Sequence, residues 1–149
     1  MLVRCLYASR FAKPLPASHL DQILVQSRRN NPRRGITGLL CFTGDLFVQV
    51  IEGGRDEVSE LFATIAHDDR HQDVRLLTYE EIAERKFGSW TMGQVNIETV
   101  NPALLLKYSE KAELNPFRSS GHTTMALLLE LVATGSIVNR AAPEGFDVL

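Results

Sequence analysis

Two apolar runs joined by Gly44-Asp45 dominate residues 35–52 and constrain the fold more than any other part of the chain. The runs are rich in Leu, Ile, Val and Phe, which suit the pleated and buried surface of a strand. Gly and Asp between them tolerate the positive φ that a two-residue hairpin turn requires. The segment therefore predicts a β-hairpin around which the other elements must pack.

One polar residue interrupts the second run of this hairpin. Gln49 lies between Val48 and Val50, with Phe47 and Ile51 beyond, so both faces of its strand are apolar. Apolar residues on both faces are typical of a central strand. A buried primary amide needs partners for its donors and its acceptor, and leaving them unpaired costs a few kcal/mol. Gln49 therefore raises the question of which groups it binds.

Length and composition indicate one ordinary domain followed by a tail. The chain has 149 residues, of which 44% are hydrophobic, and this is enough to bury a core without metals or disulfides. The formal net charge is −2, and apart from Arg28-Arg29 and Arg33-Arg34 the basic residues are scattered. A nucleic-acid binder would show a basic patch, so nucleic acid is not expected as a partner.

The cysteines and the lack of long apolar runs bear on the compartment. Cys5 and Cys41 lie within predicted strands among apolar neighbours, which favours small buried side chains over a disulfide or a metal site. No run approaches about 18 apolar residues, and the N-terminus lacks the layout of a signal peptide. We therefore expect a cytoplasmic protein with no metal and no membrane contact.

The segments before the hairpin predict a strand and a helix. Residues 2–9 form a compact apolar run that is typical of a strand. Ser18 and Asp21 resemble a capping pair, and apolar residues follow at helical spacing, so we place a helix at about 19–30. This helix is expected to end before Pro32, because the residue before a proline is pushed out of the α region.

The segments after the hairpin predict one more helix and two more strands. Apolar residues recur at i, i+3, i+4 and i+7 from Val58 to Ile65, which predicts a helix at roughly 56–67. Residues 73–82 and 89–96 are predicted as strands. The order β-α-β-β-α-β-β is an α+β, ferredoxin-like arrangement with a mixed sheet extended to five strands, in which both helices cover one face.

The character of the chain changes after about residue 97. A short helix is expected from Asn101-Pro102 to about Ser109, and a second one at roughly 119–133. An apolar stripe along the second helix predicts that the pair caps the sheet face left bare by the first two helices. The expected parts are a domain at 1–97, a helical cap at 98–135 and a loosely ordered tail at 136–149.

Side chains from separate elements can converge on the helix-covered face of this sheet. Phe47, Gln49 and Ile51 share one face of their strand, and Trp90 and Met92 share one face of theirs. With the two helices as walls, they would form a slot that fits a planar ligand with polar edges. The candidate residues of the slot are Tyr7, Ile23, Ser27, Asn31, Phe47, Gln49, Ile65, Trp90 and Met92.

Each of these residues also fits a purely structural role. A strand tyrosine such as Tyr7 commonly packs in a core with its hydroxyl on a carbonyl, and Trp90 and Met92 are ordinary core side chains. Gln49 could bond a neighbouring backbone group, and Asn31 before a proline is a natural helix terminator. The alternation of side chains along the strands leaves both interpretations open.

Five segments carry a family resemblance when they are taken together. They are Tyr7-Ala8-Ser9, Asn31 followed by Gly35-Ile36-Thr37-Gly38-Leu39-Leu40, Phe47-Val48-Gln49-Val50-Ile51-Glu52-Gly53, Asp68-Asp69-Arg70-His71, and Arg85-Lys86-Phe87-Gly88-Ser89-Trp90-Thr91-Met92. In this order and at this spacing they resemble the BLUF domains, which are blue-light sensors using flavin. The resemblance covers residues 2 to about 97.

The resemblance implies a photoreceptor that holds FAD noncovalently between the two sheet-facing helices, with Gln49 between the Tyr7 hydroxyl and the N5/O4 edge of the flavin. In the family, excited flavin takes an electron and then a proton from the tyrosine through the glutamine. Recombination leaves the glutamine rotated or tautomerised, and the changed hydrogen bonds shift the flavin absorption modestly to the red. Trp90 and Met92 are the family's candidates for relaying this change, and the sequence leaves open which of them lies beside the flavin.

The resemblance also implies supporting roles around the ring. Asn31 would bind the N3/O4 edge, Arg70 would reach O2, and Asp68 with His71 would hold that edge or the ring in place. A planar guanidinium is a plausible partner for a carbonyl on a fixed ring. The cofactor-binding residues implied are Ile23, Ser27, Asn30, Asn31, Phe47, Gln49, Ile65, Asp68, Arg70 and His71.

Two departures concern the ring edge or the phosphate end of the cofactor. Some relatives carry a basic residue just before the position of Ile65, where this chain has Thr64. No Gly-rich loop of the phosphate-cradling kind is present, because Gly53-Gly54 more simply separates a strand from a helix. The choice of FAD over FMN or riboflavin therefore rests on the family alone.

The residues beyond the sensory core are too few for a second ordinary catalytic domain. The chain resembles short BLUF proteins, which implies a sensor that is not an enzyme and that signals through an unidentified protein partner or a homo-oligomer, a dimer first. One alternative is a light-insensitive interaction module that has lost flavin, which Tyr7, Asn31 and Gln49 argue against. The other is a small hydrolase or flavin redox enzyme, for which no nucleophile–base pair is evident.

Overall fold

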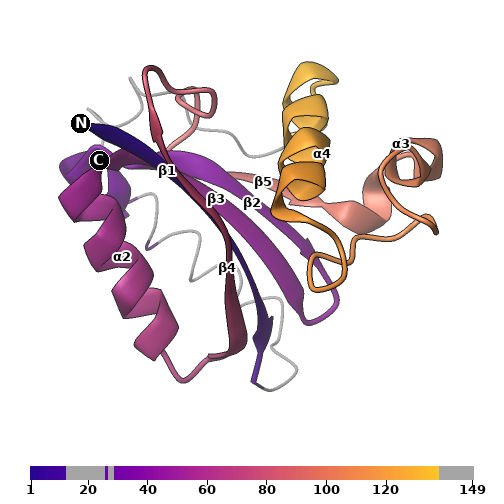
Figure 1. Cartoon of the computed structure of the whole chain (residues 1–149), viewed down its shortest axis with the longest axis horizontal. Coiled ribbons are helices and arrows are strands. Elements are labelled where there is room, and N and C mark those ends of the chain that lie inside the picture. The colour runs from indigo at the N-terminus through magenta and orange to yellow at the C-terminus, as the bar shows by residue number, and fades with distance from the viewer. Residues whose placement is uncertain (13–25, 27–28, 138–149) are drawn as a thin grey trace.

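A computed structural model describes residues 1–12, 26 and 29–137. It contains a five-stranded sheet with the strand order β4-β1-β3-β2-β5 (Figure 1). Among the strands that the structure describes, only β2 and β5 pair in parallel, so the sheet is mixed and the predicted α+β class is confirmed. The strands are β1 (Leu2–Phe11), β2 (Thr37–Thr43), β3 (Leu46–Gly54), β4 (His71–Ile82) and β5 (Gly93–Asn96).

The hairpin forms as predicted from β2 and β3. Thr43 pairs with Leu46 across the two-residue turn, and Gly44 has a φ of 57°, which the first position of a primed turn requires. Gly38 carries a second constraint, because a Cβ there would lie 2.1 Å from the carbonyl oxygen of Val50. Close approach of the two strands therefore depends on a missing side chain.

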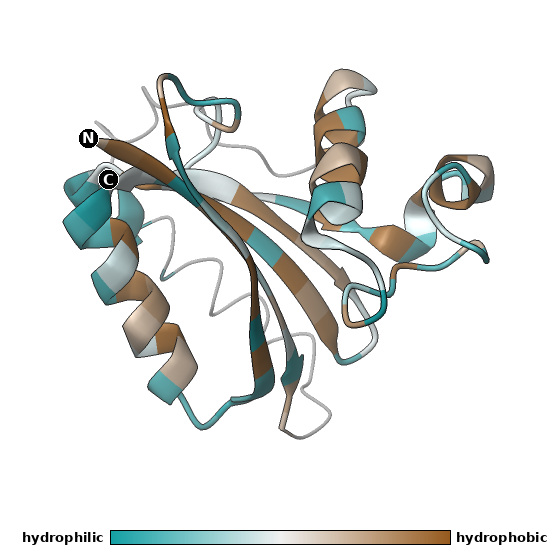
Figure 2. Cartoon of the chain, in the orientation of Figure 1, coloured by the Kyte–Doolittle hydropathy of each residue, from teal (hydrophilic) through white to brown (hydrophobic). Residues whose placement is uncertain are grey.

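Both faces of the sheet are buried, which explains the nearly continuous apolar runs of its strands. One face packs against α2 (Arg55–His67) and the other against α4 (Gly121–Ala133) (Figure 1). Apolar residues line the central strands and α4 in Figure 2. The α2-side cluster is Val3, Cys5, Phe11, Ile36, Leu40, Phe47, Ile51, Val58 and Met92, and the α4-side cluster includes Leu6, Ala8, Leu39, Val48, Val50, Leu127, Leu128 and Leu131.

The C-terminal helices cap the second face of the sheet, as predicted. After a short 3₁₀ turn at Ile97–Thr99, α3 spans Pro102–Leu106 and ends before the predicted Ser109, because the chain tightens into an i→i+3 bond from Tyr108 N to Leu105 O. Ser120 caps α4 by accepting from the backbone N–H of Thr123. The start of α4 lies against β4, since a Cβ on Gly121 would be 2.7 Å from the Leu77 carbonyl oxygen.

The first helix continues past the predicted stop at Pro32. Residue 26 and residues 29–34 are helical, and the helix ends at Gly35, whose φ is 65°. Ile36 N donates to Asn31 O at 2.9 Å and Gly35 N donates to Pro32 O at 3.2 Å, the bond pattern of a Schellman cap. The prediction gave too much weight to the proline, because a glycine a few residues later supplies the actual end. The predicted Ser18–Asp21 cap lies outside the described residues.

The last strand begins later than predicted. Residues 89–92 form turns and bends, and β5 starts at Gly93. The side chains of Trp90 and Met92 consequently enter opposite clusters, with Trp90 on the α4 side and Met92 on the α2 side. The expectation that they share a face was wrong, because strict alternation holds only in extended backbone.

Within the described ranges, no helix combines the length and apolar character needed to span a membrane, and no cluster of potential metal ligands occurs.

Candidate functional site

A buried chain of hydrogen bonds crosses the α2-side face of the sheet. The register of β1 and β3 places Tyr7 directly opposite Gln49. The Tyr7 hydroxyl donates to Gln49 Oε1, and Gln49 Nε2 donates to Met92 Sδ at 3.3 Å. All these side chains are buried. The partners of Gln49 are therefore a phenol on one side and a thioether, a weak acceptor, on the other.

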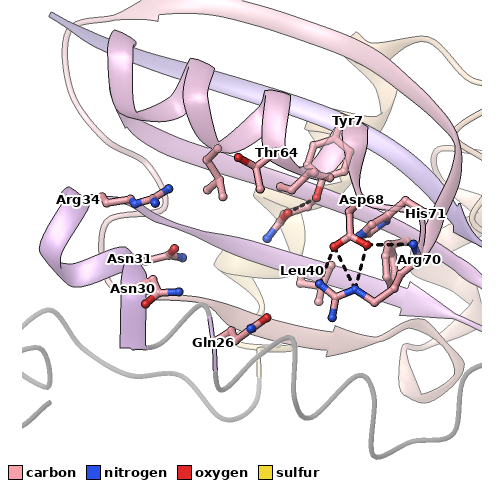
Figure 3. A pocket seen from close by; sticks show the side chains of 14 residues that line it. Tyr7, Gln26, Asn30, Asn31, Arg34, Leu40, Thr64, Asp68, Arg70 and His71 are labelled. Carbon is pink, nitrogen blue, oxygen red and sulfur yellow. Dashed lines mark hydrogen bonds and ion pairs between the residues drawn. The ribbon is translucent and has the colours of Figure 1, made fainter.

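The Tyr7–Gln49 pair forms the floor of a cavity of about 280 Å³ (Figure 3). This volume is close to the lower end of the range of roughly 300–1,000 Å³ for small-molecule sites. The walls come from the first helix, from α2 and from the start of β4. The lining residues are Tyr7, Gln26, Asn30, Asn31, Arg34, Leu40, Phe47, Gln49, Leu61, Thr64, Ile65, Asp68, Arg70 and His71.

Asn31 connects the first helix to the segment that carries Met92. Its side chain is 3% exposed, and its Nδ2 donates to the carbonyl oxygen of Thr91 at 3.1 Å. Asn31 is therefore more than a helix terminator, because its amide lines the cavity and fixes the 91–92 backbone beside Gln49. Asn30 also lines the cavity but is exposed.

An ion pair and a histidine occupy one end of the cavity. Arg70 donates from Nε and Nη2 to Asp68, with an Nη2–Oδ2 distance of 2.6 Å. Hydrogen bonding from Arg70 lowers the pKa of the Asp68 carboxyl. His71 Nδ1 lies 2.9 Å from Ser9 Oγ, and burial lowers the pKa of the imidazole, which favours its neutral form.

The surroundings of Tyr7 keep its phenol protonated. Its ring makes an edge contact with Phe62 at a centroid distance of 5.5 Å. Burial is the main cause that raises the pKa of Tyr7, and it also raises the pKa of the neighbouring Cys5 thiol to about 12. The hydroxyl is thus a firm hydrogen-bond donor toward Gln49 at neutral pH.

The structure brings together most of the residues proposed from the sequence. Ile23 and Ser27 lie outside the described residues, so their predicted place in the wall is untested. Trp90 does not line the cavity: it packs in the α4-side cluster, and its Nε1 has no hydrogen-bond partner among the described residues. Asn30, Asn31, Phe47, Gln49, Ile65, Asp68, Arg70 and His71 all line the cavity, together with Tyr7.

Gln26 and Arg34 are cavity residues that the sequence reasoning missed. They lie four residues before and after Asn30, a spacing that places side chains on the same side of a helix. This signal was available, but a helix expected to end at residue 30 could not include Arg34. Leu40 and Leu61 were also missed, and both are apolar wall residues without a distinguishing pattern.

The donor set of the cavity suits a flat heteroaromatic ring. Leu40, Phe47 and Leu61 provide apolar surface, while Asn31 and Gln49 present amides that both donate and accept. Neutral amides can bond carbonyl and ring-nitrogen groups without requiring a charge on the ligand.

Comparisons with known proteins agree with this geometry. The family described as "Sensors of blue-light using FAD" (BLUF) matches residues 2–93. The chain is 36% identical over 87 residues to the photoactivated adenylate cyclase subunit beta of Euglena gracilis, covering 58% of this chain and 10% of that protein. It thus spans about a tenth of the length of this relative.

Solved structures match over a greater share of their own length. BlsA in its photo-activated state has a TM-score of 0.78 at 30% identity, with 89% of this chain and 95% of that chain covered. BlrB, described as a BLUF protein in its dark state, has a TM-score of 0.76 at 35% identity, with 90% and 96% covered. By its family match and its fold, the chain belongs to the BLUF family of blue-light sensors.

Proposed function

We propose that this chain is a blue-light photoreceptor that binds a flavin noncovalently in the cavity above Tyr7 and Gln49. The observation that carries the proposal is the hydrogen-bonded sequence Tyr7–Gln49–Met92 in the floor of that cavity, in a chain of the BLUF family. Residues 1–97 serve as the photosensory domain in this proposal, and residues 98–135 serve as its output segment.

The residues present fit an isoalloxazine ring and its polar edge. Gln49 and Asn31 face the carbonyl and ring-nitrogen edge, and Arg70 with Asp68 and His71 closes the far end of the slot. Ile23, Ser27, Phe47 and Ile65 contribute to the walls in this proposal. The neutral amides in the floor do not require a charged ligand, which agrees with the neutral state of the ring. FAD is the proposed form of the flavin.

A bound flavin supplies absorption of blue light and, once excited, an acceptor for one electron. Tyr7 is the donor, because its ring is buried in the floor of the cavity. A phenol that has lost an electron is strongly acidic, so the Tyr7 proton would pass to Gln49 Oε1 along the hydrogen bond already present, while the amide would release a proton from Nε2 and stay neutral. Return of one electron and one proton would restore the Tyr7 phenol and leave the Gln49 amide rotated or tautomerised.

The change at Gln49 reaches the rest of the sheet through Met92. When the ends of the amide exchange roles, Gln49 Nε2 no longer donates to Met92 Sδ as it does here. Met92 directly precedes β5, and Asn31 holds the preceding carbonyl at Thr91. Met92, rather than Trp90, is therefore the proposed dark-state neighbour of Gln49 and the first member of the relay.

The output is a signal to another protein and not a reaction catalysed by this chain. Relatives named as photoactivated adenylate cyclases and as a blue light- and temperature-regulated antirepressor from Escherichia coli indicate that related sensor domains work with varied effectors. We propose that a separate protein or an oligomer contact plays this role here, in the cytoplasm.

A light-minus-dark absorption spectrum of the purified protein tests the function. The proposal predicts a yellow protein with a reversible shift of the flavin bands to the red. Tyr7→Phe should keep the flavin and lose this shift, whereas Tyr79→Phe, at an exposed tyrosine outside the cavity, should behave like the wild type. A protein that no flavin reconstitutes would refute the proposal, and irreversible bleaching would favour a redox enzyme.

A further inference from the structure

The rim of the cavity along the first helix is polar and ends in a cation. Gln26, Asn30 and Arg34 line it at steps of four residues, above the buried Asn31. Figure 3 shows the Arg34 side chain at the end of the helical segment, on the same side of the cavity as Asn30 and Asn31. Asp68 and Arg70 lie together on the other side.

The charges that line the cavity are unevenly balanced. Among the lining residues that the structure describes, Asp68 is the only carboxylate, and it is bound by Arg70 through Nε and Nη2. Arg34 makes no hydrogen bond or ion pair with any residue that the structure describes. With His71 shifted toward its neutral form, Arg34 carries the positive charge of the described lining that no described residue neutralises.

No structural role for Arg34 is found within the described part of the chain. The end of its helix is capped by the backbone of Gly35 and Ile36, which bond Pro32 and Asn31. On the facing helix, Thr64 donates its hydroxyl to the Glu60 carbonyl. Thr64 is neutral and its hydroxyl is already hydrogen-bonded, so α2 adds no cation to the cavity lining.

We propose that Arg34 binds the phosphate of the flavin side chain and makes the site selective for phosphorylated flavins over riboflavin. This inference rests on the proposed flavin-binding function. A guanidinium offers a planar fork of donors that matches phosphate oxygens, and FMN, as a phosphate monoester, carries a charge of about −1.5 to −2 at neutral pH. The neutral amides deeper in the cavity do not distinguish these ligands.

Competition between riboflavin and FMN tests the assignment, because the two differ only in the phosphate. The full-length protein is equilibrated in the dark with an equal excess of both, and the flavin it retains is released and quantified. Wild type should prefer FMN by about tenfold, which corresponds to about 1.4 kcal/mol. Arg34→Gln should reduce that preference to about twofold or less while the affinity for riboflavin stays unchanged.

Arg33→Gln is the matched control, because Arg33 is exposed and does not line the cavity. It should keep the preference for FMN. If Arg34→Gln keeps the wild-type ratio, or if Arg33→Gln lowers it equally, Arg34 is not the phosphate partner although the flavin site stands. If wild type binds neither flavin, the proposed function and this inference are both wrong.

Discussion

At the scale of single residues, the unusual position is Gln49, a polar side chain on a strand buried on both faces. The sequence indicated that its amide must have partners, and the structure supplies Tyr7 and Met92. Burial of an amide is tolerated when its groups are paired. The same pairing makes Gln49 sensitive to any change at Tyr7, because the amide can exchange donor and acceptor ends at little steric cost.

His71 makes the stability of the folded protein depend on pH. Burial lowers its pKa from the usual 6.5, an effect that the neighbouring Asp68 opposes and Arg70 reinforces. Below pH 6.5 the unfolded chain binds a proton at this site that the folded chain does not, so stability falls as the pH drops toward the folded pKa. The stability that the ionised Asp68 carboxyl contributes is lost only at more acidic pH, because its pKa is lowered from 3.8.

Thermal unfolding measured between pH 7.5 and 5 checks this prediction. Over this interval the melting temperature of the wild type should fall further than that of His71→Gln, because the variant lacks the titrating imidazole. His67→Gln, at an exposed histidine of α2, controls for removal of an imidazole. Equal pH dependence of His71→Gln and wild type would contradict a buried, neutral His71.

At the scale of elements, a buried carboxylate anchors the loop that leads to the site. Glu52 at the end of β3 is fully buried and accepts from Arg4 Nε at 2.7 Å and from the backbone N–H groups of Lys86 and Phe87. These bonds tie β1, β3 and the start of the 85–92 segment together. Because Trp90 and Met92 belong to that segment, their placement depends on Glu52.

Glu52→Gln should therefore destabilise the protein by about 3 kcal/mol, the lower end of the cost of breaking a buried ion pair, because Arg4 keeps its second partner, the half-exposed Glu80. Urea unfolding measures the change. Glu81→Gln is the control, because Glu81 pairs with Arg55 on the surface, where both side chains are about half exposed, and its loss should cost about 1 kcal/mol or less. A Glu52 variant as stable as the Glu81 variant would show that the network contributes little.

Gly38 is the other element-scale constraint, on β2 where it pairs with β3. Gly38→Ala places a methyl 2.1 Å from the Val50 carbonyl oxygen, and backbone cannot move aside as a side chain would. We expect a loss of about 3 kcal/mol or more in unfolding free energy. Gly54→Ala, where no atom lies within 4 Å, should change stability by less than about 1 kcal/mol. Similar stability of the two variants would contradict the crowding.

The elements were predictable where periodicity dominates and unpredictable where local bonding decides. Apolar spacing from Val58 to Ile65 placed α2 within a residue, and Gly-Asp placed the hairpin turn. Pro32 suggested an early helix end, but the Gly35 cap determines the actual one. Trp90 and Met92 lie on opposite faces of the sheet because the 89–92 backbone is irregular. The alternation of side chains expected of a strand cannot predict such an irregularity.

At the scale of the whole molecule, the sheet separates the cavity from the C-terminal helices. The cavity lies on the α2 side, and α4 covers the opposite side with Leu127, Leu128 and Leu131 buried (Figure 1). Met125, Leu129 and Val132 of α4 are only half-buried. In the proposed function, a signal from the site must therefore pass through the sheet. We expect a partner protein to contact these half-buried residues.

That surface is the proposed contact of a homodimer. Light scattering in the dark and under blue light should give a mass about twice that of the chain in at least one state, and Leu129→Lys should shift the protein toward monomer. Lys111→Glu, an exposed charge change outside α4, should leave the mass unchanged. A protein that stays monomeric in both conditions at micromolar to millimolar concentration would refute the dimer.

In the proposed mechanism the Gln49 amide, held between Tyr7 and a flavin, is the light-driven switch. The most direct test is the light-minus-dark absorption spectrum of Gln49→Leu, with Gln94→Leu on β5, outside the cavity, as control. Gln49→Leu should bind flavin but show no reversible red shift, while Gln94→Leu should retain it. A normal, reversible red shift in Gln49→Leu would show that the Gln49 amide is not the switch.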